Sequence, residues 1–328
     1  MLQAKYQKRG PVPQESIEAV TVEQPALKEG EVLLEILAAP INPSDVLTLT
    51  GEYGILPPLP AVGGNEGVGR VSELGAGVSG LEVGQTVLLP IGIGSWASHA
   101  VANAKGLVPL PNDADPRQLC MMTVNPPTAV LMLQQFVNLN EGDWVIQNAA
   151  NSGVGGYLIQ EAKRRGLKSI NVVRRESALA SVEGQGGDVN LVDGPDLHKR
   201  VREATGGAPV HLAIDAVGGE ATNHLANCVA EGGVVVNYGM MSGEPCHVSP
   251  ANIVFRDVSL KGFWLSRWFK NASKEAQGKL FGDVIKQIAT GQIKSTIAAE
   301  YDVSQIKEAV AAAASGERNG KILIVPKR

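Results

Sequence analysis

The chain has 328 residues, of which 44% are hydrophobic and 19% are charged, and its formal net charge is −4. This length allows two domains with separate cores, and the composition is typical of a soluble globular protein. No basic region recurs and no apolar run reaches the length of a bilayer span, so neither nucleic-acid binding nor membrane insertion is expected. The first residues, MLQAKYQKRG, lack the apolar core of a secretory signal, which predicts a cytoplasmic protein.

The N-terminal third contains short β-like runs separated by Gly and Pro, a pattern that predicts a β-rich domain. These runs are Glu31–Ala38, Gly67–Glu73, Thr86–Pro90 and His99–Val101. A helical pattern follows over Asp115–Phe136, and the prolines of Asn125–Pro127 are expected to break it.

Strand-like and helix-like segments alternate between Asp143 and Phe263, which is the pattern of a doubly wound parallel sheet in an α/β protein. The predicted strands are Asp143–Gln147, Ser169–Val173, Val189–Val192, Val210–Ala216, Gly233–Tyr238 and Val258–Phe263. Helices are predicted over Lys274–Thr290 and Ser304–Ala314, followed by a closing strand, Lys321–Val325, that is expected to return to the first domain. The predicted domains are therefore 1–118 with 295–328, and 119–294.

The stretch from Asp143 to Val173 reads as strand, small-residue turn, helix and strand. The turn, NAANSGVGG, leads into a predicted helix, Val154–Arg165, and such a turn directs backbone N–H groups toward an anion such as a pyrophosphate. In the register of the G-x-G-x-x-G fingerprint the chain has Ala150, Ser152 and Gly155, so the fingerprint is incomplete. The alternative is a crossover whose glycines only permit close contact between helix and strand.

The residues after the second strand of this unit indicate which dinucleotide it binds. An acidic residue normally stands there and holds the ribose 2′-hydroxyl, but this chain has Arg174 and Arg175. Two cations favour a 2′-phosphate, so the pattern predicts NADP(H) rather than NAD(H).

Residues that bind metals do not occur at metal-site spacings. The three cysteines (Cys120, Cys228 and Cys246) are far apart, and the five histidines show no ligand pattern. Neither a disulfide framework nor a metal site is predicted.

Blocks spread over nearly the whole chain are similar to the zinc-free medium-chain dehydrogenase/reductase superfamily, and in particular to its mitochondrial-type 2-enoyl thioester reductases. The blocks are INPSD at 41–45, GEYGILPPLP at 51–60, GGNEG at 63–67, VNP at 124–126, IQNAANSGVG at 146–155, NVVR at 171–174, YG at 238–239 and GFWLSRW at 262–268. The resemblance implies a Rossmann domain, a GroES-like catalytic domain and a homodimer joined through the cofactor domain. Zinc-dependent relatives have a histidine at the place of Asn65.

The resemblance also assigns residues to the site. The catalytic tyrosine corresponds to Tyr53. The arginine that binds the 2′-phosphate corresponds to Arg174. The family often has Asp-Arg after this arginine, whereas this chain has Arg175-Glu176, which leaves open which arginine contacts the phosphate. The implied cofactor-binding residues are Asn125, Ser152, Gly153, Val154, Gly155, Arg174, Arg175, Tyr238, Gly239, Met240, Met241, Phe263, Trp264, Leu265, Ser266 and Lys321.

The implied reaction is hydride transfer from NADPH to the β-carbon of an activated double bond. Negative charge then develops on the substrate carbonyl oxygen, and an uncharged donor near it would stabilise that charge. A tyrosine hydroxyl is protonated at neutral pH, so Tyr53 is predicted to donate a proton or to orient the substrate; the alternative is a loop aromatic that packs at the domain cleft. Trp264, Trp268 and Phe269 either line an acyl pocket or belong to an ordinary core, and Asn42 and Asp45 either orient the loop or cap a turn.

The leading functional hypothesis is an NADPH-dependent reductase of 2-enoyl thioesters carried by coenzyme A or by acyl carrier protein. An NADPH:quinone reductase is the first alternative, because it shares the cofactor half without requiring a tyrosine donor. Small α,β-unsaturated carbonyl compounds are also possible substrates. A third hypothesis is a non-catalytic NADPH-binding protein.

Overall fold

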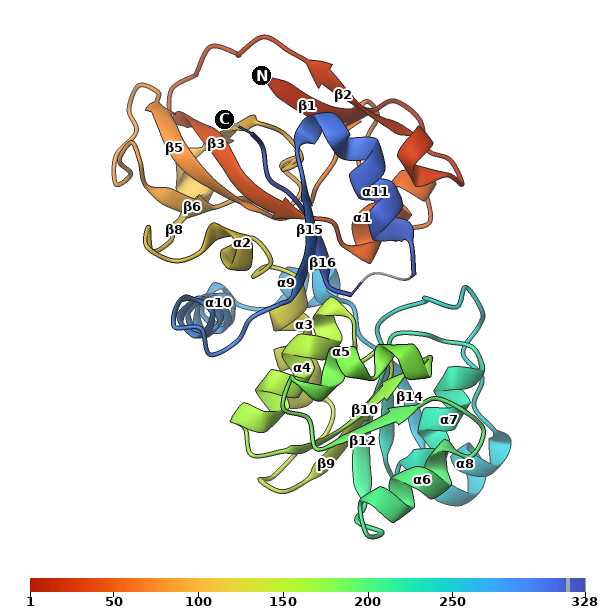
Figure 1. The fold of residues 1–328 in the computed structure, drawn as a ribbon. Coiled ribbons are helices and arrows are strands. Elements are labelled where there is room, and N and C mark those ends of the chain that lie inside the picture. The colour runs from red at the N-terminus through yellow and green to blue at the C-terminus, as the bar shows by residue number, and fades with distance from the viewer. Residues whose placement is uncertain (317–318, 328) are drawn as a thin grey trace. The chain divides into compact units, whose positions relative to one another are not determined.

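The computed structural model describes residues 1–316 and 319–327 (Figure 1). The chain forms two compact units: unit 1 consists of Met1–Val124 and Phe281–Arg328, and unit 2 is Asn125–Leu280. In the part of the chain that is described, no helix is both long and apolar enough to cross a membrane. The assignment of catalysis to 1–118 with 295–328 and of cofactor binding to 119–294 remains a prediction.

Unit 1 is rich in β-structure, as its many short runs predict. A three-stranded sheet has the order β2-β1-β4, and a larger sheet has the order β15-β16-β3-β5-β6-β8, with β7 also paired to β3. The strands are β1 (Leu2–Tyr6), β2 (Ile17–Thr21), β3 (Glu31–Pro40), β4 (Ala61–Val62), β5 (Val68–Leu74), β6 (Thr86–Leu88), β7 (His99–Asn103), β8 (Val108–Pro109), β15 (Ile297–Tyr301) and β16 (Lys321–Ile324).

Strand β3 organises unit 1, because β5, β7 and β16 all pair with it in antiparallel fashion. Its alternate residues Val32, Leu34 and Ile36 are buried in one apolar core. The pairing of β16 with β3 joins residue 323 to residue 40 and so places the C-terminal strand in unit 1.

The helices of unit 1 are few and short. They are α1 (Pro43–Thr50), α2 (Pro116–Leu119) and α11 (Ile306–Ala314), and α10 (Lys274–Ala289) runs from unit 2 into unit 1. Helix α1 was not predicted, yet its start carries a capping box in which the Asn42 N–H donates to Asp45 at 2.7 Å. Gly51, with φ of 93°, ends the helix in the left-handed conformation that glycine adopts without steric cost.

Unit 2 is the predicted doubly wound α/β structure. Its six strands are parallel and lie in the order β11-β10-β9-β12-β13-β14. The strands are β9 (Trp144–Gln147), β10 (Lys168–Val173), β11 (Val189–Val192), β12 (Val210–Asp215), β13 (Val234–Asn237) and β14 (Ser259–Gly262). The helices are α3 (Asn125–Gln135), α4 (Gly153–Arg164), α5 (Ala180–Glu183), α6 (Leu197–Ala204), α7 (Glu220–Cys228), α8 (Pro250–Arg256) and α9 (Leu265–Asn271).

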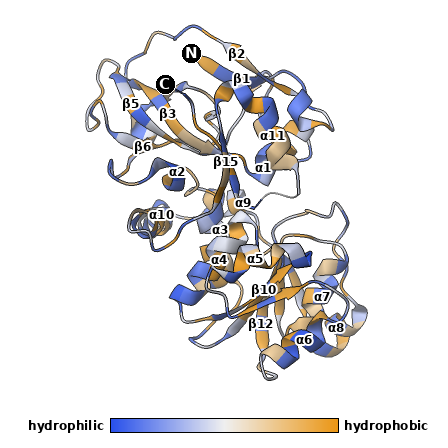
Figure 2. Cartoon of the chain, viewed as in Figure 1, coloured by the Kyte–Doolittle hydropathy of each residue, from blue (hydrophilic) through white to orange (hydrophobic). Residues whose placement is uncertain are grey.

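Alternate residues of β10 show that helices cover both faces of this sheet. Ile170 and Val172 share a core with Leu197 of α6 and with residues of α7. Val173 points to the other face and shares a core with Ile159 of α4. Both faces of the strand are therefore apolar, and Figure 2 colours β10 and β12 as hydrophobic.

Two further segments, both in unit 2 or at its start, differ from their predictions. The segment predicted as a broken helix, Asp115–Phe136, contains α2 and α3, and the prolines at 126 and 127 lie in the first turn of α3 instead of breaking it. Proline is tolerated there because the first N–H groups of a helix have no intrahelical acceptor. Helix α9 was not predicted: Leu265, Trp268 and Phe269 have the helical spacing i, i+3 and i+4, but seven residues are too few for this periodicity to be read from the sequence.

Candidate functional site

The start of α4 forms a tight turn at the carboxyl end of β9. Ser152 is the N-cap residue, and its hydroxyl accepts a hydrogen bond from the Gly155 N–H at 3.1 Å. A Cβ on Gly155 would come within 2.5 Å of the Ala150 carbonyl oxygen, so the helix contacts the preceding turn directly. Helix α4 thus begins at a turn of small residues, and the first N–H groups of a helix are suited to binding an anion.

The two arginines after β10 differ in their surroundings. Arg174 is exposed, and within residues 1–316 and 319–327 its guanidinium has no hydrogen-bond or ion-pair partner. Arg175 is half-buried and precedes a short 3-10 helix, Glu176–Ala178. An exposed cation at the end of the second strand is suited to an anionic group on a nucleotide ribose.

Tyr238 follows β13, and the structure brings it to the α4 turn. Burial raises the pKa of the Tyr238 hydroxyl, a hydrogen bond with Ser152 opposes the shift, and the nearby negative charge of Asp215 adds to it. A Cβ on the next residue, Gly239, would meet the Ala216 carbonyl oxygen at 2.5 Å, whereas Met240 and Met241 are exposed. Two of the predicted cofactor segments, 152–155 and 238–241, therefore lie together.

The remaining predicted cofactor residues of unit 2 lie on other elements. Asn125 is buried and begins α3, while Leu265 and Ser266 begin α9. Phe263 is buried against Phe136, with ring centroids 6.3 Å apart, whereas Trp264 is 37% exposed. The Phe263 side chain is thus part of an aromatic core contact.

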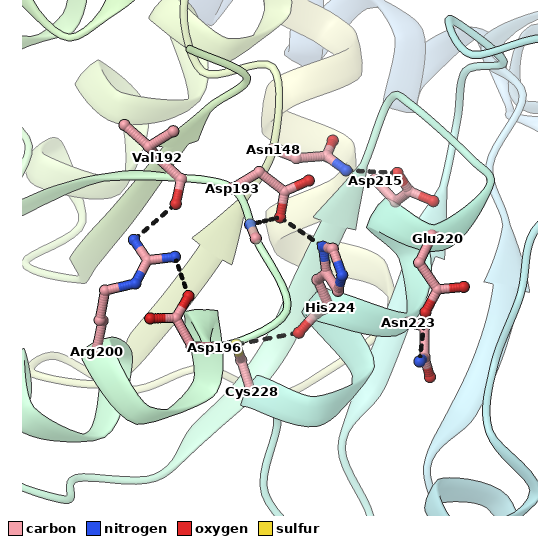
Figure 3. A network of polar contacts seen from close by, with 11 residues as sticks. Asn148, Val192, Asp193, Asp196, Arg200, Asp215, Glu220, Asn223, His224 and Cys228 are labelled. Atoms are coloured by element: carbon pink, nitrogen blue, oxygen red, sulfur yellow. Dashed lines mark hydrogen bonds and ion pairs between the residues drawn. The ribbon is translucent and has the colours of Figure 1, made fainter. Parts of the chain in front are cut away.

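Polar residues at the ends of three strands form a group that was not predicted from the sequence. Asn148 follows β9, Asp215 ends β12 and Asn237 ends β13, and Figure 3 shows the Asn148 amide turned toward the Asp215 carboxylate. At the end of β11, Asp193 accepts a hydrogen bond from the His224 ring at 2.8 Å (Figure 3). A polar residue that ends an apolar strand, as in HLAID, was the signal that could have found Asp215.

In unit 1, Tyr53 lies just beyond the end of α1. Its N–H donates to the Leu47 carbonyl at 3.2 Å, so the backbone at Tyr53 is tied to the helix, and the residue is half-buried. The guanidinium of Arg9 donates to the Pro57 carbonyl in the same loop, and the Gly10 N–H donates to the Leu49 carbonyl at 3.1 Å. The N-terminal segment is therefore hydrogen-bonded both to α1 and to the loop that contains Tyr53.

Beside α1 lies a buried polar network centred on Glu66, which is fully buried. Its carboxylate accepts hydrogen bonds from the Asn42 amide at 2.7 Å and from the N–H groups of Thr123 and Val124 at 3.0 Å each. Burial raises the pKa of Glu66 to about 7, although Lys321 and Asn42 oppose the shift.

Asp45 and Lys321 complete this network. The Lys321 ammonium is buried and donates to the Asn42 side chain at 2.5 Å and to the Ile41 carbonyl at 3.3 Å. Asp45 accepts from Asn65 at 2.7 Å, and burial raises its pKa to about 6. That Lys321 reaches the cofactor stays a prediction; in this structure its ammonium stabilises the segment before α1.

Asn65, the position at which the resemblance implies histidine in zinc-dependent proteins, belongs to this network through its hydrogen bond to Asp45. Among the described residues, no three His, Cys, Asp or Glu side chains gather in a way that could hold a metal ion.

Comparison with known proteins identifies the family. Residues 28–112 match the family model described as an alcohol dehydrogenase GroES-like domain, and residues 153–279 match the one described as a zinc-binding dehydrogenase. The mitochondrial enoyl-[acyl-carrier-protein] reductase of Rattus norvegicus is 39% identical over 86% of this chain and 77% of its own length. The chain belongs to the medium-chain dehydrogenase/reductase superfamily. It is therefore an oxidoreductase, and its predicted fold class, a Rossmann sheet with a GroES-like domain, is confirmed.

Solved structures of this superfamily match the whole chain. A complex of Etr1p with NADP and crotonyl-CoA has 26% identity and a TM-score of 0.86, and the match covers 99% of each chain. A mitochondrial 2-enoyl thioester reductase heterodimer from Candida tropicalis matches with the same identity, TM-score and coverage. A structure from Bacillus thuringiensis described as a putative NADPH:quinone reductase has 28% identity and a TM-score of 0.87, again over 99% of each chain.

The prediction of a cytoplasmic location is wrong by this comparison. The curated relatives from rat, human and Arabidopsis thaliana are all named as mitochondrial proteins. The reasoning failed because the lack of an apolar segment argues only against secretion, whereas organelle-targeting segments are amphipathic.

Proposed function

We propose that this chain is an NADPH-dependent reductase of 2-enoyl thioesters in which Tyr53 assists the reaction. The observation that carries the proposal is the similarity to enoyl reductases at 36–39% identity over 86–92% of the chain in rat and human. The tyrosine of the GEYG block lies in a loop fixed at both ends, by α1 and by Arg9.

The residues of unit 2 fit a phosphorylated dinucleotide. At Gly155, the third glycine position of the fingerprint, a Cβ would collide with the Ala150 carbonyl, so α4 starts in direct contact with the turn, as in dinucleotide-binding units. The partner-free guanidinium of Arg174, within the described residues, supplies a cation for a 2′-phosphate. Both features support NADPH as the cofactor.

NADPH, when bound, supplies the hydride. The protein contributes position and charge stabilisation. Tyr53 has a hydroxyl that can donate to a substrate carbonyl oxygen as negative charge develops there, or pass a proton to the α-carbon. Asn125, at the start of α3, and Tyr238, beside Ser152, would orient the cofactor.

A quinone reductase is the second candidate, and the Bacillus thuringiensis structure favours it, because it matches the whole chain with a TM-score of 0.87. Such an enzyme would use the same α4 turn and Arg174 but would not need the Tyr53 hydroxyl.

The two candidates are separated by NADPH oxidation at 340 nm, measured in parallel with crotonyl-CoA, a longer trans-2-enoyl-CoA, the corresponding acyl-carrier-protein thioester and a soluble quinone. Turnover of the thioesters that falls at least about tenfold in Tyr53→Phe supports the proposal, because removing a transition-state hydrogen bond commonly has an effect of this size. Tyr301→Phe is the matched control, since Tyr301 lies in β15 of the same unit.

Turnover of the quinone alone, unaffected by Tyr53→Phe, would replace the proposal with the second candidate. No oxidation of NADPH with any acceptor, together with measurable NADPH binding, would favour the non-catalytic hypothesis.

We also propose that two copies of the chain associate through unit 2. β14 is an edge strand, and next to it in sequence α8 exposes Val254 by 69% and Phe255 by 79%. Leu260 of β14 is 41% exposed as well. An unpaired strand edge beside exposed apolar side chains is a surface suited to a two-fold contact. Phe255→Glu should therefore produce a monomer in analytical ultracentrifugation; an unchanged sedimentation coefficient would exclude this contact.

A further inference from the structure

The Asp215 carboxylate accepts several hydrogen bonds at the carboxyl ends of the central strands of unit 2. It is fully buried. One oxygen, Oδ1, accepts from the Asn148 amide at 2.7 Å and from the N–H groups of Val217 at 2.9 Å and Gly218 at 3.1 Å. The other, Oδ2, accepts from the Thr222 hydroxyl at 2.6 Å and the Asn237 amide at 3.0 Å.

All five of these donors are neutral groups. A carboxylate can be buried without a cation only if its lone pairs are satisfied by hydrogen bonds, and here they are. Each donor is consequently held by a charged acceptor, which makes these hydrogen bonds stronger than those between neutral groups.

Val217 and Gly218 belong to the loop that directly follows Asp215, whereas the other three donors come from separate elements. Asn148 follows β9, Thr222 lies in α7 and Asn237 ends β13. β9 and β12 are neighbours in the sheet, and the chain leaves β9 toward β10 on one side and returns to β12 on the other. They flank the switch point of the sheet, outside which doubly wound proteins bind their ligands. Figure 3 shows the Asn148 amide and the Asp215 carboxylate directed at each other at these strand ends.

Further hydrogen bonds connect this group to the two segments proposed to bind the cofactor. Asn148, which directly precedes the 149–152 turn, also accepts from the Ala216 N–H at 2.8 Å. Asn237 donates to the Gly239 carbonyl at 2.9 Å, and the Tyr238 N–H donates to the Asp215 carbonyl at 2.9 Å. Movement of Asp215 would therefore displace both the turn before α4 and the 238–241 segment.

We propose that Asp215 is a positioning residue for the cofactor: it fixes the ends of β9, β12 and β13 in the arrangement that binds NADPH. This inference rests on the proposed function. Asp215 itself need not touch the cofactor, since its lone pairs are occupied by the protein.

The test compares NADPH dissociation constants, measured by fluorescence titration without substrate, with thermal stability. Asp215→Asn should weaken NADPH binding at least about tenfold, because the amide nitrogen faces hydrogen-bond donors on whichever side it lies. Val201→Ala is the matched control: Val201 is buried in the core of the same sheet but on α6, away from the strand ends. It should lower the melting temperature while leaving the dissociation constant unchanged.

A second pair of variants keeps the test decisive if Asp215→Asn fails to fold. Thr222→Val preserves the shape of the side chain and removes its hydroxyl, whereas Thr222→Ser keeps the hydroxyl and removes the methyl group. A positioning role through Asp215 predicts weaker NADPH binding in Thr222→Val than in Thr222→Ser. A role in packing alone predicts the reverse order.

Two results overturn the inference in distinguishable ways. If the unaltered protein binds no NADPH, the proposed function falls and this role falls with it. If the unaltered protein binds NADPH but Asp215→Asn and Thr222→Val bind it equally well, only the role of Asp215 is refuted.

Discussion

Adding one methyl group should destabilise the protein more at Gly155 than at Gly156, although the two positions are adjacent in the first turn of α4. A Cβ on Gly155 would lie 2.5 Å from the Ala150 carbonyl oxygen and 2.8 Å from the Ala149 carbonyl oxygen, both of which are backbone atoms. A Cβ on Gly156 would meet only the Gln185 side-chain oxygen, at 2.8 Å, and that side chain can rotate.

The magnitudes follow from these contacts. Replacing glycine by alanine inside a helix stabilises it by roughly 1 kcal/mol, and this gain is available at both positions. At Gly155 the backbone must also move to accommodate the methyl group, and overpacking of this kind costs about 1–3 kcal/mol. At Gly156 a rotamer change of Gln185 suffices, and its cost is the hydrogen bond from the Gln185 amide to the Ser181 carbonyl, about 0.5–1.5 kcal/mol. The propensity gain cancels between the two variants, so at the middle of both ranges Gly155→Ala should be less stable than Gly156→Ala by roughly 1 kcal/mol.

Urea denaturation followed by circular dichroism measures the difference, and NADPH titration of the same two variants tests its functional consequence. Gly155→Ala should bind NADPH more weakly, because relief of the clash displaces the turn before α4, whereas Gly156→Ala should bind it like the unaltered protein. Equal stability of the two variants, or higher stability of Gly155→Ala, would show that the turn is not closed as the structure describes.

Three further predictions concern charge. Arg174→Ala should weaken NADPH binding much more than NADH binding, because only NADPH carries the 2′-phosphate; equal weakening of both, measured by titration, would contradict the 2′-phosphate role. Burial raises the pKa of Glu66 to about 7 and that of Asp45 to about 6, so the folded state holds more protons than the unfolded state up to about pH 7. The free energy of unfolding should consequently fall as the pH rises from 5 to 7.5, and urea titrations at these two values check the sign. Glu66→Gln should flatten this dependence, and a slope equal to that of the unaltered protein would mean that Glu66 does not titrate in that range.

The sequence alone determined the parts of the fold that depend on local periodicity. The βαβ unit at the cofactor turn was readable because its strands are short apolar runs and its turn holds only small residues, and β9, α4 and β10 begin within one residue of the predicted positions. The arginine at the end of β10 was likewise visible as a departure from the usual acidic residue.

The tertiary structure decided which polar residues act together. Asn148, Asp215 and Asn237 lie far apart in sequence, and only the parallel sheet brings their strand ends to one place. In the same way, the pairing of β16 with β3 places Lys321 beside Asn42. The lysine therefore has a buried hydrogen-bond partner that no local sequence pattern predicts. The partners of buried polar groups are set by contacts between segments that are distant in sequence, such as Asn148 with Asp215 and Lys321 with Asn42. Local periodicity therefore predicts the apolar strands and helices, whereas the polar network is seen only in the folded structure.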